Sequence, residues 1–303
     1  MRSLQAIIIA AGALLWLVGS SALAEEYTFS YQKIIDTEQP VVLHLGLVRG
    51  SVYISGHDDD RLIIEAVKRV RATDEDEAEE VADHIEIKVV VLTEKVNITT
   101  NYLRMFSRKP SFWQKVIGAG SDSYGSVDYN ISLPFKSSVQ ISSMAADIEL
   151  SSIEGEIQID NTVGRTHGEF LFGPVTVRQP QGEIDLRWVE GDIRIKSSSG
   201  RVIIEQSRGA IDLSTLTGNV KIQTELDSPR DYFVETTSGS ITFLIPETSS
   251  GVLNIETQSG DIQTEMPVTI KSISRNRLEG EFGRGGPKIT LSSSSGDVIV
   301  ALY

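Results

Sequence analysis

Glycine recurs at every ninth residue through the middle of the chain, and this spacing constrains the fold more than any other feature. The series comprises Gly155, Gly164, Gly173, Gly182, Gly191, Gly200, Gly209 and Gly218. After most of these glycines the second and fourth residues are aliphatic and the first and third are polar, as in Ile193/Ile195. A period of two is typical of a strand that buries one face. Each unit therefore predicts a short strand and a turn, where glycine tolerates positive φ.

The spacing changes beyond Gly218 in a way that indicates how many units form one coil. The next copies begin at Arg230, Gly239, Gly251 and Gly260, so intervals of 12 and 9 residues alternate. Inserts at every second turn would lie on one side of the molecule if each coil held two units. We therefore favour two units per coil, with three units as the alternative. The last copies, Ile289/Leu291 and Val298/Val300, restore the nine-residue step.

Stacked units of this kind predict an all-β fold, a single-stranded parallel β-solenoid (β-helix). Each coil would pair with the next through parallel ladders about 4.8 Å apart, and the aliphatic positions would form one continuous interior stripe. We expect the β-solenoid to occupy residues 134–303. It would be continuous with the region before it, so that both form one elongated domain.

Residues 25–133 lack the nine-residue period and are expected to form an N-terminal capping region. Thr73-Asp74 precedes a run of acidic residues, which predicts a short helix from about Asp74 to Ala82. The segments 85–91 and 95–100 are expected to pair as a hairpin. A cap is needed because an open solenoid end exposes unpaired backbone groups.

The first 24 residues are typical of a secretory signal peptide. Arg2 is followed by an apolar run from Ile7 to Val18 and by the small-x-small cleavage site Ala22-Leu23-Ala24. No later stretch is apolar enough to cross a bilayer as a helix, and the sequence contains no cysteine for disulfides or lipid attachment. We therefore expect an exported protein, periplasmic or extracellular, with no transmembrane span after signal cleavage.

Charge limits the classes of partner. The formal net charge is −14 at pH 7, which argues against nucleic acid and against anionic lipid as the main partner. One basic and aromatic segment, residues 104–117, stands apart from this acidic background. We favour a loop whose aromatic rings fold back over the core of the cap, and we predict a partner-docking loop as the functional alternative. The residues of this candidate docking loop are Arg104, Phe106, Arg108, Lys109, Phe112, Trp113 and Lys115.

Residue patterns for catalysis or metal binding are missing. The four histidines have no zinc-site spacing, and the run from His57 to Asp60 is typical of a solvated turn. Acids that follow repeat glycines, such as Glu156, Glu183 and Asp192, could stack as in polysaccharide-cleaving solenoids, but Arg165 and Arg201 occupy equivalent positions. We expect no catalytic residues, no cofactor and no metal.

Several segments together resemble a known family. GSVYISGHDDDRLIIEA, an acidic helix and hairpin, DYNISLPFKSSVQISS and the Ser-Gly-Asp turns at 259–261 and 295–297 occur in this order. The order is similar to that in the putative-adhesin domains of unknown function, which are exported bacterial β-solenoid proteins related to adhesin head domains. The resemblance implies a β-solenoid at the cell envelope without defined catalytic residues.

These observations favour a non-enzymatic envelope protein that presents a repetitive β-solenoid surface for adhesion, scaffolding or partner binding. The expected partner is an envelope protein or a glycan. One alternative is a carbohydrate-active β-helix, either a polysaccharide lyase or a hydrolase. Another is a structural protein that assembles with copies of itself.

Overall fold

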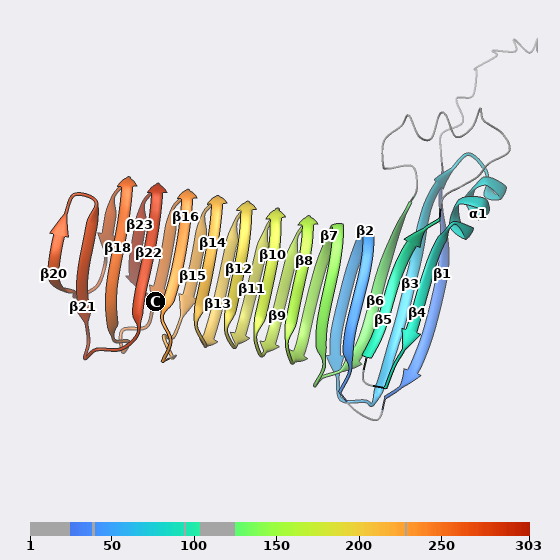
Figure 1. Ribbon diagram of the computed structural model, residues 1–303, viewed down its shortest axis with the longest axis horizontal. Coiled ribbons are helices and arrows are strands. Elements are labelled where there is room, and N and C mark those ends of the chain that lie inside the picture. Colours follow the sequence, from blue (N-terminus) through green and yellow to red (C-terminus); the bar gives the residue numbers. More distant parts are fainter. Residues whose placement is uncertain (1–24, 38–39, 94, 104–124, 228) are drawn as a thin grey trace, which may run out of the picture.

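Aliphatic side chains at the second and fourth positions of each repeat unit form the core of an elongated rod (Figure 1). The computed structural model describes residues 25–37, 40–93, 95–103, 125–227 and 229–303. The signal peptide predicted at residues 1–24 lies outside this part. The burial alternates along the strands, as in β12, where Ile193 and Ile195 are buried and Arg194 and Lys196 are exposed. This alternation confirms the prediction of an all-β parallel solenoid.

Each coil contains two strands, one on each of two opposed faces. Val175 pairs in register with Ile157 on one side and Ile193 on the other, so partners lie two repeat units apart in the sequence. The prediction of two units per coil is therefore confirmed. We call the sheet that contains β8 and β10 the first face and the sheet that contains β9 and β11 the second face.

The two faces have the following strands in spatial order. The first face contains β4 (Ile85–Val91), β5 (Lys95–Tyr102), the first half of β2 (Val42–His57), the first half of β7 (Ser138–Glu154), β8 (Ile157–Val163), β10 (Val175–Gln181), β12 (Ile193–Ser199), β14 (Ile211–Thr217), β16 (Tyr232–Ser238), β22 (Lys288–Ser295), β18 (Gly251–Ser259), β21 (Arg277–Phe282) and β20 (Thr269–Ser274). The second face contains β1 (Glu25–Asp36), β3 (Arg61–Ala72), β6 (Ser126–Pro134), the second halves of β2 and β7, β9 (Thr166–Phe172), β11 (Ile184–Glu190), β13 (Val202–Arg208), β15 (Val220–Thr224), β17 (Ile241–Ile245), β23 (Val298–Leu302) and β19 (Ile262–Thr264).

The last two strands lie inside the rod rather than at its tip. β22 pairs in parallel with both β16 and β18, and β23 pairs with both β17 and β19. The coil formed by residues 288–302 is thus inserted between two coils that precede it in the sequence. Figure 1 accordingly marks the C-terminal end short of the hairpin β20–β21, which forms that end of the rod.

Antiparallel strands and a helix form the opposite end. β1 pairs with β3, β3 with β6, and β4 with β5, all antiparallel. The helix α1 spans Glu75–Asp83, where Asp74 is the N-cap and its carboxylate accepts a hydrogen bond from the Glu77 backbone N–H at 2.8 Å. The Glu77 carboxylate in turn accepts one from the Thr73 backbone N–H at 2.8 Å, a reciprocal arrangement that fixes the start of a helix. Among the described residues, no helix is long and apolar enough to cross a membrane.

The repeat glycines are required by the close approach of successive coils as well as by backbone conformation. Gly200 has φ +131°, and a Cβ atom at this position would lie 1.9 Å from the carbonyl oxygen of Gly182 in the preceding coil. Because no real contact is this short, a side chain at Gly200 would force the coils apart.

A buried polar network lies inside the turns between the two faces. Gln179 is fully buried. Its side chain accepts a hydrogen bond from the Thr166 hydroxyl at 2.6 Å and donates to the carbonyl oxygen of Gly164 at 2.9 Å. Asn161, one coil earlier, donates to the carbonyl oxygen of Ala146 at 2.8 Å. These bonds satisfy polar backbone groups that the turns would otherwise bury without a partner, and they explain why Thr166 occupies a position that is aliphatic in other units.

Candidate functional site

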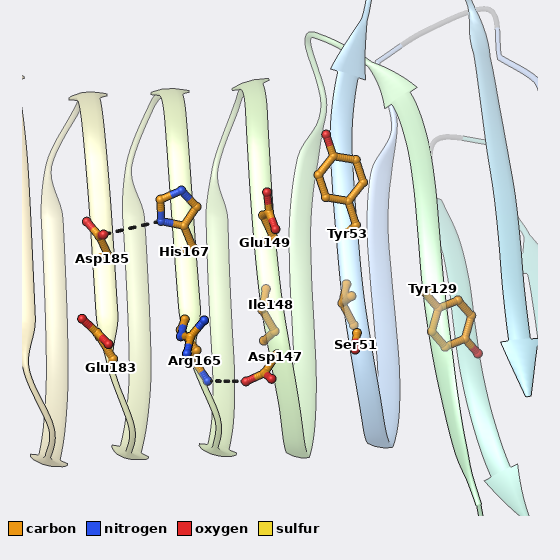
Figure 2. Close-up of a pocket in the computed structure, with 11 residues that line it drawn as sticks. Ser51, Tyr53, Tyr129, Asp147, Ile148, Glu149, Arg165, His167, Glu183 and Asp185 are labelled. Atoms are coloured by element: carbon orange, nitrogen blue, oxygen red, sulfur yellow. Dashed lines mark hydrogen bonds and ion pairs between the residues drawn. The ribbon is translucent and has the colours of Figure 1, made fainter. Parts of the chain in front are cut away.

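A groove of about 560 Å³ runs across the outer surface of the second face, over β2, β7, β9 and β11 (Figure 2). The parallel register places its side chains in two rows, because equivalent positions recur once in every coil of two units. One row contains Ser51, Asp147, Arg165 and Glu183, and the other contains Tyr53, Glu149, His167 and Asp185. Each row therefore crosses the strands at a spacing of about 4.8 Å.

A basic side chain or an imidazole lies between two carboxylates in each row. Arg165 lies between Asp147 and Glu183, and His167 lies between Glu149 and Asp185 (Figure 2). The arrangement separates the carboxylates from one another by a cation or a titratable ring. An uninterrupted acidic ladder, which a polysaccharide-cleaving solenoid would use, is therefore not formed in this groove.

The imidazole of His167 is directed at carboxylates rather than at a nucleophile. Its Nε2 lies 3.0 Å from an oxygen of Glu169, and its Nδ1 lies 3.7 Å from an oxygen of Asp185. Asp185 is also held by Arg187, with Nε to Oδ1 at 3.0 Å and Nη2 to Oδ2 at 3.1 Å. A general base for the Ser51 hydroxyl would need the imidazole within hydrogen-bond reach of that oxygen. The contacts of His167 instead orient it within the row.

Acids at the first position of repeat units, as in Asp147 after Ala146 and Asp192 after Gly191, stabilise the turns. Asp147 accepts a hydrogen bond from the backbone N–H of Arg165 at 2.8 Å, and Asp192 accepts one from Ala210 at 3.0 Å. In both cases the donor lies one coil further along the rod. Glu156 and Asp192 directly precede strands of the first face, whereas Glu183 directly precedes a strand of the second face. The three acids considered for a catalytic column thus do not share one.

The groove also contains polar side chains that are not engaged in these ion pairs and turn hydrogen bonds. Within the described chain, the carboxylates of Glu149 and Glu183 make no ion pair or side-chain hydrogen bond. The exposed Tyr53 adds a phenol. Tyr129 lies at one end of the groove, but its side chain is buried in the core, where its hydroxyl is 2.6 Å from the Thr100 hydroxyl and burial raises its pKa to about 12. The groove can therefore accept and donate hydrogen bonds while its walls stay rigid.

The docking loop predicted at Arg104, Phe106, Arg108, Lys109, Phe112, Trp113 and Lys115 lies outside the described residues and stays a prediction. In the run from His57 to Asp60, Asp59 pairs with Arg61 at 2.9 Å in a tight turn. Within the described ranges, no group of three or more histidine or acidic side chains could hold a metal ion. Sequence reasoning missed the groove itself, although the two-unit spacing of Glu149, His167 and Asp185 could have placed them side by side.

Comparisons with known proteins point to one family. A family model described as Toastrack DUF4097 matches residues 126–301, which is more than half of the chain. Similar solved structures include a putative adhesin from Bacteroides fragilis, which is 12% identical; the match covers 91% of this chain and 97% of that chain, with a TM-score of 0.41. They also include a putative lipid binding protein from Parabacteroides distasonis, which is 12% identical; the match covers 89% of this chain and 96% of that chain, with a TM-score of 0.42.

A third similar structure is a putative adhesin from Parabacteroides merdae, which is 10% identical; the match covers 90% of this chain and 96% of that chain, with a TM-score of 0.31. Comparison with curated protein sequences gives no significant match.

Proposed function

Starting from the fact that this chain belongs to the Toastrack DUF4097 family, we propose that it is an exported, non-enzymatic binding protein. Its rigid second face presents the groove to a component of the cell envelope, either a protein or a glycan. The observation that carries the proposal is the pair of rows in Figure 2. They offer free carboxylates and hydroxyls at fixed spacing, while the His167 ring is directed at carboxylates rather than at a hydroxyl nucleophile.

Rigidity supports binding rather than catalysis by a mobile site. Each row lies on parallel strands that are hydrogen-bonded on both sides, as β9 is to β7 and β11. The backbone of such a ladder loses little conformational freedom when a ligand binds, which lowers the entropic cost of association. The groove is therefore prearranged for a ligand with several polar groups.

The test is binding of the labelled protein to isolated cell envelopes, with two single variants of equal charge change. Glu149→Lys reverses a charge in the groove, and Glu235→Lys reverses one on the exposed surface of the first face. We expect saturable binding that Glu149→Lys weakens at least tenfold and Glu235→Lys leaves unchanged, since about 1.4 kcal/mol of lost contact is a tenfold change in affinity. Equal binding by all three proteins, or none by the wild type, would contradict the proposal.

A panel of acidic and neutral polysaccharides tests the non-enzymatic part separately. The carbohydrate-active alternative requires a pair of acids free to act as general acid and base. Release of new reducing or unsaturated ends by the wild-type protein, lost in Glu149→Lys, would overturn the proposal in favour of a lyase or hydrolase.

Self-association is a second candidate, favoured by one specific observation. β20 is an outer strand of the first face, and each of its residues is exposed, including Ile270 (51%) and Ile273 (64%). An exposed apolar edge strand can pair with another chain. Light scattering over a range of protein concentrations should show larger species that Ile273→Lys abolishes; a strict monomer at high concentration would exclude this candidate.

A further inference from the structure

Two aromatic rings stack on the outer surface of the second face, away from the groove. Phe170 of β9 and Trp188 of β11 have ring centroids 4.7 Å apart and an interplanar angle of 10°. Both rings are about half exposed, at 44% and 49%. Both residues also have positive φ, +55° and +49°, a conformation that is unfavourable for bulky side chains. The core does not require aromatic rings here, because the rings point outward.

The aromatic column ends abruptly at Trp188. Between β11 and β13, Leu186 pairs with Ile204 and Val189 pairs with Gln206, so that the two residues Arg187 and Trp188 oppose Glu205 alone. This is a β-bulge in β11, and the extra residue Ser207 in β13 restores the register where Glu190 pairs with Arg208. The strand after Trp188 therefore adds no third ring, and the side of Trp188 away from Phe170 borders open space.

That space is part of a pocket of about 410 Å³ whose lining extends from Phe170 and Phe172 of β9 to Gln223 of β15 and Tyr303. Trp188 lies beside Phe170 toward one end of this pocket. Tyr303, at the far end, has its pKa raised by partial burial and by the charge of Glu225. The volume lies in the range of small-molecule sites, which is about 300–1,000 Å³.

The pocket is acidic and contains no cation of its own. Its charged lining consists of Glu190, Glu205 and Glu225, with no lysine or arginine among the lining residues. Glu190 is paired with Arg208 at 2.8 Å, whereas Glu205 and Glu225 have no ion pair among the described residues. Two carboxylates without an ion pair therefore line the same pocket as the exposed Trp188.

We propose that this pocket binds a quaternary ammonium group of the choline type. Such a cation is attracted by the negative face of the Trp188 indole ring and by the carboxylates that line the pocket. A primary ammonium would have to give up more tightly held water than a methylated cation before it could contact the indole face. A neutral sugar would leave the charges of Glu205 and Glu225 without a counter-charge. The methylated cation avoids both penalties, and its methyl groups pack against Trp188.

The proposal goes beyond the groove function and is tested independently of it. Trp188 reports binding directly, because Trp16 lies in the predicted signal peptide and Trp113→Phe removes the other tryptophan of residues 25–303. We expect choline to change the fluorescence of Trp188 saturably in this Trp113→Phe background. The uncharged analogue of choline, in which carbon replaces nitrogen, should bind at least tenfold more weakly.

Variants locate the site and protect the test against misfolding. Glu205→Gln keeps the shape of the side chain and removes one charge, and it should weaken choline binding at least threefold by calorimetry. Trp188→Leu should weaken it at least tenfold, with circular dichroism to verify folding. The control Glu235→Gln removes a charge from the first face and should bind as the wild type does.

Three results would overturn the proposal: equal binding of choline and its uncharged analogue, binding of glucose without binding of choline, or unchanged affinity in Glu205→Gln. An arm with phosphatidylcholine vesicles identifies the source of the group. Co-sedimentation that depends on Trp188 supports a lipid headgroup, and binding of choline without co-sedimentation supports a free cation. Loss of envelope binding in Glu149→Lys with intact choline binding would separate the two functions.

Discussion

Replacing Gly200 by alanine tests the physical basis of the nine-residue repeat. The new Cβ atom would lie 1.9 Å from the Gly182 carbonyl oxygen, whereas ordinary contacts begin at 3.4 Å, so the two coils must move apart at this turn. Hydrogen bonds between these coils join Gly182 N–H to the Ser199 carbonyl and Ile184 N–H to the Arg201 carbonyl, both at 3.0 Å. Their loss costs about 1 kcal/mol each, and the φ of +131° adds about 1–3 kcal/mol of strain.

The expected loss in free energy of unfolding is therefore about 3–5 kcal/mol, measured by urea denaturation followed by circular dichroism. Two control variants separate the causes. Gly285→Ala adds a side chain at φ +71° with nothing within 4 Å, and should show strain alone. Gly46→Ala, where the nearest atoms are 3.9 Å away and φ is not positive, should stay within about 1 kcal/mol of the wild type. The reasoning fails if Gly200→Ala is no more destabilising than Gly46→Ala.

Three further perturbations have defined outcomes. Gln179→Leu leaves the Thr166 hydroxyl and the Gly164 carbonyl without their partner, and should lower the free energy of unfolding by about 2–4 kcal/mol. The control Gln181→Leu, at an exposed position, should not lower it. Equal melting temperatures for the two variants would contradict this reasoning. Below pH 10 the Tyr129 phenol is protonated in both states, but between pH 10 and about 12 it ionises only in the unfolded chain. Ionisation of Tyr129 should lower the free energy of unfolding by up to about 3 kcal/mol over that window. The urea midpoint should therefore fall less steeply with pH in Tyr129→Phe than in the wild type. Parallel pH profiles of the two proteins would refute the raised pKa of Tyr129. Removal of residues 288–303 separates β16 and β17 from β18 and β19, and should produce aggregation detectable by light scattering rather than a shorter soluble rod.

The repeat made most of the architecture predictable. Strand positions follow from the two-residue alternation after each glycine, and the alternating long and short intervals beyond Gly218 correctly indicated two units per coil. The start of α1 followed from Thr73-Asp74 and the acidic residues behind it, because capping depends on local sequence. These features are local or strictly periodic, which is why they could be read from one sequence.

The spatial order of the coils and the position of the pocket could not be predicted, because both depend on features that do not alter the nine-residue period. The unit at Ile289/Leu291 has the same pattern as its neighbours, so no local signal shows that it is inserted between earlier coils. The bulge at Trp188 leaves its unit as long as that of β13, because the extra residue Ser207 in β13 restores the register before Glu190 pairs with Arg208. Prediction of the groove required only one further step. Glu149, His167 and Asp185 become neighbours once each coil is known to hold two units.

The position of the inserted coil determines how this end of the molecule can acquire its structure. A chain that emerges with its N-terminus first, as from the export channel that the proposed function implies, can add coils one after another as far as β17, each on a completed template. The segment that forms β18 to β21 has no template at that stage, because its neighbours in the parallel ladders emerge later. Residues 246–302 must therefore order as a cooperative unit after the last strand has emerged. The order in which these strands emerge therefore differs from the order in which they stack. We expect the ordering of the C-terminal fifth of the protein to be the slow step of folding, and this segment to be the most exposed to proteases until folding is complete.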